Sequence, residues 1–219
     1  GDRLYIPQGR AAPITLNQND GKKTGTIGQA GGTFCLLTED HQLIAGPPNQ
    51  KERDEQLRIA DPKSGKRLTT FNNTTRVVVT EGKAYLHSIG NLQCLDLTRK
   101  AQLETLLSNR RATLKNLDPK VETNLAQIEV LKKEISTLQT QIKSCLLWTI
   151  AHPAPFELVV AGAQLIVGLD NQVSILDIKT GKPLWQHKVT GKAYGLTPAE
   201  GRLIVSTDLG YIHTFHKKP

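Results

Sequence analysis

The sequence lacks several features that would place it quickly in a class. It has no methionine, two tryptophans and three cysteines among its 219 residues. No apolar run reaches the ~20 residues that a membrane-spanning helix needs, and no secretory signal pattern stands at the start. Because the chain opens with Gly1-Asp2 and has no methionine, we expect it to be a piece of a longer protein.

The short motifs of common catalytic and metal sites are also missing. Cys35, Cys94 and Cys145 are widely spaced and fit neither a zinc site nor a disulfide framework. The glycine–lysine pairs lack the spacing of a phosphate-binding loop, and no G-x-S-x-G or H-E-x-x-H occurs. The histidines and aspartates suggest no metal cluster. We therefore predict no catalytic, cofactor-binding or metal-binding residues.

What the sequence does contain is a core-forming composition and an excess of positive charge. Hydrophobic residues make up 38% and charged residues 22%, which excludes a disordered tail. There are 28 basic and 20 acidic residues, a net charge of +8.

A repeat of about 40 residues organises most of the chain. Similar apolar segments begin at Arg3, Gln42, Lys83, Gln164 and Arg202. The stretches LRIADPKSGKRL from Leu57 and SILDIKTGKPLW from Ser174 are also related, and each predicts two strands joined by a turn that ends in a glycine.

The clearest unit, from Phe156 to Val189, predicts four short antiparallel strands with turns at 162–163, 170–171 and 180–181. Such units are typical of β-propeller blades. Eighteen strands are expected, grouped as three, four, four, four and three, which favours an arc of a larger propeller or one completed by another chain. A closed ring of five blades is the alternative.

One blade is interrupted by a helical insertion. Asp177 and Trp185 are 8 residues apart, whereas the equivalent Asp96 and Trp148 are 52 apart. The intervening segment has apolar residues at heptad spacing, which predicts an antiparallel coiled-coil hairpin that returns to the same blade edge. The heptad residues are Val121, Ile128, Ile135 and Ile142, with Leu131, Leu138 and Cys145. The stripe Leu103, Leu107, Leu114 and Leu117 faces them from the first arm.

The ends of this hairpin also follow from the sequence. Asp118 before Pro119 predicts the start of the second helix, because aspartate caps helices and proline suits their first turn. Cys145 then lies at the base of the hairpin, away from Cys94, so we expect no disulfide between them. The predicted organisation is an all-β propeller or partial propeller, with blades in 1–98 and 146–219 and the hairpin in 99–145.

The strand–LDIKTGKPLW–strand pattern resembles the PQQ-like β-propeller repeat, best in Ser174 to Trp185. That family includes quinoprotein alcohol dehydrogenases and the β-barrel assembly lipoprotein of bacterial outer membranes. The resemblance implies four-stranded blades in which Trp148 and Trp185 dock one blade on another, and it favours a bacterial, periplasmic or extracytoplasmic location. The vicinal cysteine pair and calcium ligands of the quinoproteins are missing here, so PQQ is not expected and no cofactor is predicted.

The hairpin holds a large share of the charge. Between Arg99 and Lys143 there are nine basic and five acidic residues, an excess of 9 − 5 = +4. The candidate partner-binding residues are Arg110, Arg111, Lys115 and Lys120. An ordinary solvated helix face is the alternative interpretation, and the lack of interleaved aromatics disfavours nucleic acid.

These observations favour a non-catalytic protein-interaction scaffold whose hairpin binds a partner protein. Two alternatives stay open. The chain can be the propeller domain of a larger redox or other enzyme, or a sensor that binds a small ligand in the propeller funnel. The identity of the partner and the oligomeric state do not follow from the sequence.

Overall fold

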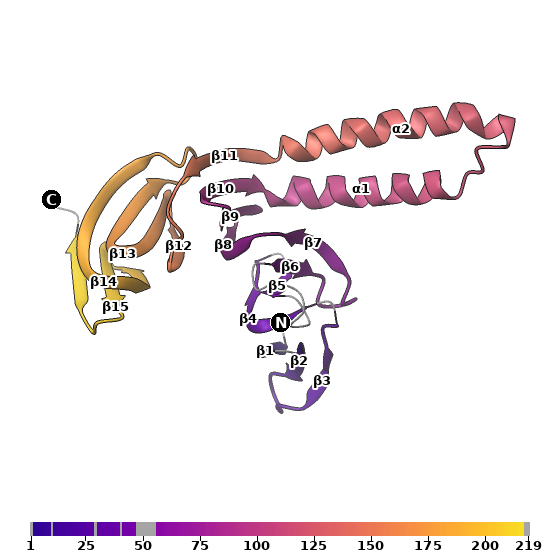
Figure 1. The fold of residues 1–219 in the computed structure, drawn as a ribbon. Helices are drawn as coiled ribbons and strands as arrows, with labels where there is room; N and C mark the ends of the chain where they lie inside the picture. The colour runs from indigo at the N-terminus through magenta and orange to yellow at the C-terminus, as the bar shows by residue number, and fades with distance from the viewer. Residues whose placement is uncertain (1, 10, 29, 40, 47–55, 217–219) are drawn as a thin grey trace. The chain divides into compact units, whose positions relative to one another are not determined.

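The computed structural model describes residues 2–9, 11–28, 30–39, 41–46 and 56–216. The described chain is mostly β, with antiparallel sheets and two long helices (Figure 1). It divides into a first unit, Gly1–Phe71 with Leu95–Leu147, and a second unit, Asn72–Cys94 with Trp148–Pro219. The predicted ranges 1–98, 99–145 and 146–219 divide the chain by sequence position, whereas these two units group residues that contact one another in the structure.

The first unit contains two antiparallel sheets of short strands. The first sheet consists of β1 (Arg3–Gln8), β2 (Ala11–Asn17) and β3 (Lys23–Thr26), and the second of β4 (Gly31–Leu37), β5 (Leu43–Gly46), β6 (Leu57–Ala60) and β7 (Arg67–Phe71), each in chain order. All four residues of β5 and of β6 are buried. These inner strands are nearly all apolar because both of their faces are covered.

The same unit carries α1 (Leu97–Lys115) and α2 (Glu122–Lys143), which pack along each other. We call residues 97–143 the helical arm. Its helices are about 28 and 33 Å long at 1.5 Å per residue. Asp96 caps α1 by accepting a hydrogen bond from the Arg99 N–H at 2.9 Å.

The predicted start of the second helix at Asp118 is wrong. The helix begins at Glu122, and its N-cap Val121 makes no side-chain cap hydrogen bond. Asp118 instead accepts from the Lys120 N–H at 2.9 Å, and its carbonyl accepts from the Asn124 side chain at 3.0 Å. Asp118 therefore stabilises a separate turn between the helices rather than the helix itself.

Two further antiparallel sheets follow. One contains β8 (Thr74–Thr80), β9 (Lys83–Ser88), β10 (Asn91–Asp96) and β11 (Leu146–Ala151), in the order β11-β10-β9-β8. The other contains β12 (Glu157–Ala161), β13 (Gln164–Asp177), β14 (Pro183–Ala199), β15 (Arg202–Thr207) and β16 (Ile212–His216) in chain order. The arm is therefore inserted between β10 and β11, which are neighbouring strands of one sheet.

The ranges of β13 and β14 each contain two of the strands that the sequence predicts. The turn predicted at 170–171 is present inside β13, because the Ile178 N–H donates to the Ala163 carbonyl at 3.1 Å, which brings 172–177 back alongside 164–169. At this turn Asp170 pairs with Lys192, and the side chain of Asn171 accepts from the Gly191 N–H at 2.9 Å. The ladder shifts register there, and Asn171 has a φ of +54°. The turn residues are therefore also hydrogen-bonded to β14. Within β14 the pairing partner changes from β13 to β15 at Ala193, where the sequence predicts the start of the last blade.

The interior of β13 contributes to two cores on opposite faces of its sheet. Leu165 and Val167 belong to a core with Tyr85 and Leu92, whereas Ile166 belongs to a second core with Val205. Successive side chains of a strand point to opposite faces, so an apolar run of this kind fills both cores at once. This accounts for the unbroken apolar run of the sequence at this point.

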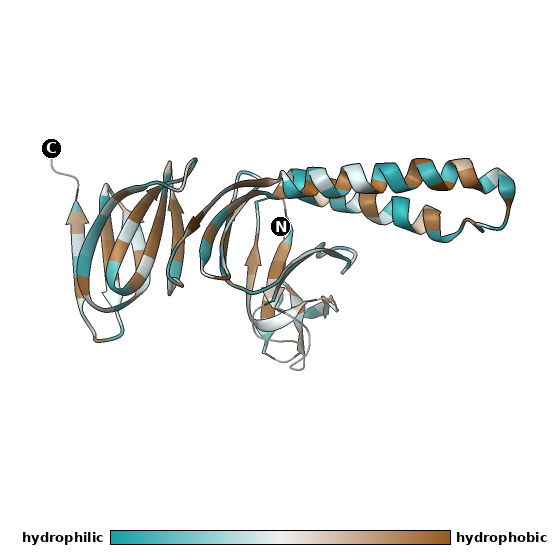
Figure 2. Cartoon of the chain, turned by 45° about the horizontal axis from the view of Figure 1, so that its top comes forward, coloured by the Kyte–Doolittle hydropathy of each residue, from teal (hydrophilic) through white to brown (hydrophobic). Residues whose placement is uncertain are grey.

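Both tryptophans pack against these cores. Trp148 packs on the first core, and its indole N–H donates to the Ile178 carbonyl at 3.1 Å. Trp185 packs on the second, with its ring centroid 5.1 Å from that of Phe215 in an edge-on arrangement. Figure 2 shows apolar residues along the strands that contribute to both cores.

Three turns share one hydrogen-bond pattern, which makes the sequence repeat visible in the backbone. They begin at Asn17, Asp61 and Asp177. In each, the N–H of a glycine four residues later donates to the first residue's carbonyl at 2.8–2.9 Å, and that glycine has a φ of +67° to +70°. The sequence alone indicated only a weak copy of this turn around Gly21.

We expect alanine to be far more harmful at Gly181 than at Gly65. Both glycines have φ near +70°, so alanine costs roughly 1–2 kcal/mol of backbone strain at either site. A Cβ at Gly181 would lie 2.8 Å from the Trp148 ring, whereas at Gly65 it meets nothing within 4 Å. Overpacking adds about 1–3 kcal/mol at Gly181 only. Urea unfolding of both variants measures this difference, and equal losses would contradict the Trp148 contact.

We also expect acid to weaken the two aspartate turns. The Ser64 hydroxyl beside Asp61 and the Thr180 hydroxyl beside Asp177, with nearby backbone N–H groups, lower the pKa of both carboxyls. A lowered folded-state pKa stabilises the fold above the ordinary aspartate value of about 3.9, and this stabilisation is lost as pH falls through the folded value.

The test is the melting temperature of the double variant Asp61→Asn/Asp177→Asn between about pH 6 and about pH 2. Its decline with acid should be shallower than in the parent chain, because Asn17 shows that asparagine fits the same turn without titrating. Identical slopes would contradict the prediction.

Candidate functional site

The described residues offer little of the chemistry that catalysis or metal binding requires. Among residues 2–216, apart from the short undescribed gaps, no three His, Cys, Asp or Glu side chains come together as metal ligands. His87 Nε2 lies 3.1 Å from the His152 carbonyl, and His152 Nδ1 lies 2.9 Å from the Pro153 carbonyl. Burial lowers the pKa of His152, which favours its neutral ring, and the rings of both histidines lie against backbone carbonyls.

The three cysteines are free thiols. Burial raises the pKa of Cys35 to about 11, and burial likewise raises the pKa of Cys145. A thiol with a raised pKa carries little thiolate at neutral pH and is a poor nucleophile.

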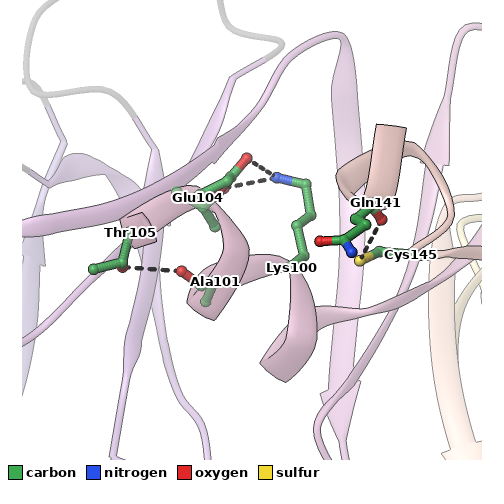
Figure 3. Close-up of polar contacts among 7 residues, drawn as sticks. Lys100, Ala101, Glu104, Thr105, Gln141 and Cys145 are labelled. Carbon is green, nitrogen blue, oxygen red and sulfur yellow. Dashed lines mark hydrogen bonds and ion pairs between the residues drawn. The ribbon is translucent and has the colours of Figure 1, made fainter. Parts of the chain in front are cut away.

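The base of the arm is fixed at two points. The Asp96 N–H donates to the Cys145 carbonyl at 2.8 Å, which closes the two ends of the arm on each other. Lys100 forms an ion pair with Glu104 and donates to the Thr69 hydroxyl of β7 at 3.0 Å (Figure 3 shows the pair). The ammonium also lies 5.7 Å from the centre of the Phe71 ring. Lys100 thus ties α1 to the neighbouring sheet of the first unit.

The middle of the arm is held by a narrow apolar contact. Leu103 and Leu107 of α1 and Ile128 and Leu131 of α2 are the residues buried there. Leu103, Leu107, Ile128 and Leu131 all belong to the stripes that the sequence indicated, whereas Val121, at the start of the predicted heptad series, is 45% exposed. The supercoil that heptad spacing implies stays a prediction.

The four predicted partner-binding residues do not behave alike. Arg110 is engaged within the arm, because its Nε lies 2.7 Å from the Glu134 carboxylate of α2. Arg111, Lys115 and Lys120 are exposed and have no ion pair among the described residues. Lys115 ends α1, where a positive charge also favours the helix dipole. The structure thus leaves three of the four available at the far half of the arm.

A groove along the arm was not predicted. It is a shallow hollow of about 380 Å³ between the two helices. Its lining residues are Leu106, Arg110, Val130, Lys133, Glu134, Thr137 and Leu138. Leu106 is 47% exposed and Val130 55% exposed. Each directly precedes a seam leucine, and a widened apolar stripe of this kind is the signal by which the groove could have been found.

The charge of the arm is also uneven. Three of its five acids are ion-paired within it, since Glu104 binds Lys100, Glu129 binds Lys132 and Glu134 binds Arg110. Six basic residues remain without an ion pair among the described residues, against the two acids Asp118 and Glu122. The excess among the unpaired residues is again 6 − 2 = +4, so the ion pairs within the arm leave its net positive charge unchanged.

No protein family matches the chain, and no curated protein matches it either. Solved structures do. The computationally designed Ika8 protein aligns with 99% of this chain and 56% of its own length, at a TM-score of 0.62 and 10% identity. The β-propeller domain of Cps50 (Swd1) from Myceliophteria thermophila covers 99% of this chain and 62% of its own, at 0.59 and 12%.

BamB from Moraxella catarrhalis aligns with 99% of this chain and 70% of its own, at a TM-score of 0.50 and 12% identity. The chain thus spans between just over half and 70% of these three structures. At such low identity the comparison shows the fold alone, and that fold is a β-propeller. Neither described helix is long and apolar enough to cross a membrane.

We expect removal of the Lys100 side chain to loosen the base of the arm. Lys100 is 15% exposed and has three partners, so Lys100→Ala should cost about 1.5–3 kcal/mol of unfolding free energy. The matched control is Lys132→Ala. Its ion pair with Glu129 is 58% and 65% exposed, and such pairs contribute about 0–1 kcal/mol. Urea unfolding compares the two variants, and similar losses would mean that Lys100 is not an anchor.

Proposed function

We propose that this chain is a non-catalytic protein-interaction scaffold, in which a β-propeller carries the helical arm as its partner-binding element. The observation that carries this proposal is the exposure of the arm. Of the residues in its two helices, only Leu97, Leu103, Leu107, Ile128 and Leu131 are buried. Ordering a residue costs about 1–2 kcal/mol, and the arm buries little apolar surface of its own in return. Binding of a partner protein would account for the presence of an ordered segment that buries so little of its own surface.

We further propose that the blades are PQQ-like repeats without PQQ. The turns that begin at Asp61 and Asp177 support this assignment, since they share a hydrogen-bond pattern as well as the D-x-K-[ST]-G sequence. The proposal includes no catalytic role for this chain and no cofactor. The raised pKa values of the half-buried Cys35 and the buried Cys145 support a role without a cysteine nucleophile.

The partner is expected to be a protein that meets the basic half of the arm. Arg111, Lys115 and Lys120 are exposed there and are not neutralised by neighbours among the described residues. Long-range attraction of an acidic surface would speed association, and it would weaken at high salt.

The structure suggests how to remove the arm. Because the Asp96 N–H and Cys145 carbonyl are hydrogen-bonded, an Asn-Gly turn can replace residues 97–144 and join the two strands as a hairpin. The armless variant should lose helical circular dichroism and keep a cooperative melt. That result must come first, so that lost binding is not confused with lost folding.

We expect the intact chain to capture a partner from an extract of its source cells and the armless variant to lose it, as judged by mass spectrometry. The triple variant Arg111→Glu/Lys115→Glu/Lys120→Glu should lose the same partner. Its control is Lys66→Glu/Lys182→Glu/Lys188→Glu, which changes the net charge equally at exposed positions outside the arm. Capture of the same proteins by the folded armless variant would overturn the arm as the binding element.

A further inference from the structure

We infer that the groove of the helical arm binds one amphipathic helix with acidic flanks, which lies beside α1 and α2 as a third helix. This inference rests on the proposed function, because it specifies the chemistry of the partner that the arm would bind. It is carried by three features of the groove: its apolar floor, its length and the charge of its rim.

The floor of the groove is apolar and uncovered. Leu106 of α1 is 47% exposed and Val130 of α2 is 55% exposed, on either side of a seam that already buries Leu107 and Leu131. Two paired helices that present apolar residues beside their seam have the surface into which a third helix packs its ridge. An amphipathic helix in a groove of this kind is an established mode of recognition.

The length of the groove sets the size of the occupant. On α2 its lining runs from Val130 to Leu138, which is eight residue steps or about 12 Å at 1.5 Å per residue. A helix of two to three turns covers that length, with apolar anchors at positions i, i+3 or i+4, and i+7.

The rim of the groove selects acidic flanks. Lys133 lines it without an ion pair among the described residues. Arg110 forms an ion pair with Glu134, but its side chain is 47% exposed, so its guanidinium is also accessible to a carboxylate of the incoming helix. Arg110 and Lys133 against Glu134 leave the rim positive, in agreement with the excess of +4 over residues 99–143.

Two other occupants fit these observations less well. A second copy of the chain would bring together two arms that each carry an excess of +4, and like charges oppose that contact. Nucleic acid would use the cations and leave Leu106 and Val130 exposed, since phosphates have no apolar face. Both are therefore outcomes of the test rather than parts of the proposal.

The experiment uses the intact chain and a fluorescein-labelled synthetic peptide of about three heptads, with leucine at a and d and glutamate at e and g. The matched peptide has lysine at e and g and the same leucines. Fluorescence anisotropy should give binding of the glutamate peptide at least about tenfold tighter than that of the lysine peptide, and weaker at about 500 mM than at about 50 mM salt.

Two variants locate the binding. Leu106→Glu/Val130→Glu changes exposed side chains of the groove and should weaken binding of the glutamate peptide by at least about tenfold. The control is Leu125→Glu, because Leu125 is 48% exposed on α2 but does not line the groove. Its affinity should equal that of the parent chain.

Several outcomes would overturn the inference. Equal binding of both peptides would mean that the charged rim selects nothing, and equal weakening by the control variant would place the contact outside the groove. Arm-dependent dimers that Val130→Glu abolishes in sedimentation would show that a second copy occupies it. A 20-base-pair DNA duplex that competes with the peptide, and still binds Leu106→Glu/Val130→Glu, would show a phosphate site instead.

The two proposals can fail separately. If the arm is required for capture of a partner but the glutamate peptide does not bind, the scaffold proposal stands and the groove assignment falls. If the peptide binds as expected but the armless variant captures the same cellular partners, the groove is an acidic-helix site and the arm is not the element that recruits those partners.

Discussion

The hydrogen bond between the Asp96 N–H and the Cys145 carbonyl is the constraint on which the arm depends. It joins neighbouring strands β10 and β11 where the chain leaves the sheet and where it returns. Everything between must therefore come back to its starting point, which requires two helices joined by a turn rather than one long helix. Lys100 adds a second attachment through Thr69 of β7, so that α1 is held to the first unit by a side chain as well as by the backbone.

The sheets are tightly packed, whereas most of the surface of the arm is exposed. In the second unit, β13 supplies Leu165 and Val167 to one core and Ile166 to another, so a substitution at any of these residues would disturb a core. The arm buries only a narrow seam and leaves Leu106 and Val130 on its flank. The proposed scaffold role uses this difference, because substitutions on the exposed arm do not disturb the cores of the sheets.

Sequence patterns predicted local features well, but they predicted side-chain contacts between distant segments poorly. Heptad spacing at Ile128 and Leu131 correctly indicated a buried helix face, and the turn residues Asp61 and Asp177 indicated equivalent connections. The contact of Lys100 with Thr69 joins residues 31 positions apart, and no periodic signal encodes it. The groove was missed because Leu106 and Val130 lie beside the heptad positions, and Arg110 looked available because its partner Glu134 comes from the other helix.

The position of the arm has a consequence for how the chain folds. Pairing β10 with β11 encloses residues 97–144, and closing a flexible loop of that length costs roughly 3 kcal/mol more than closing a two-residue turn. Helices form in about a microsecond, much faster than most sheets assemble. If α1 and α2 form and pair first, Asp96 and Cys145 are brought together before the strands meet. In that order of events the paired helices hold the ends of β10 and β11 together, so that these two strands pair as if they were neighbours in the sequence.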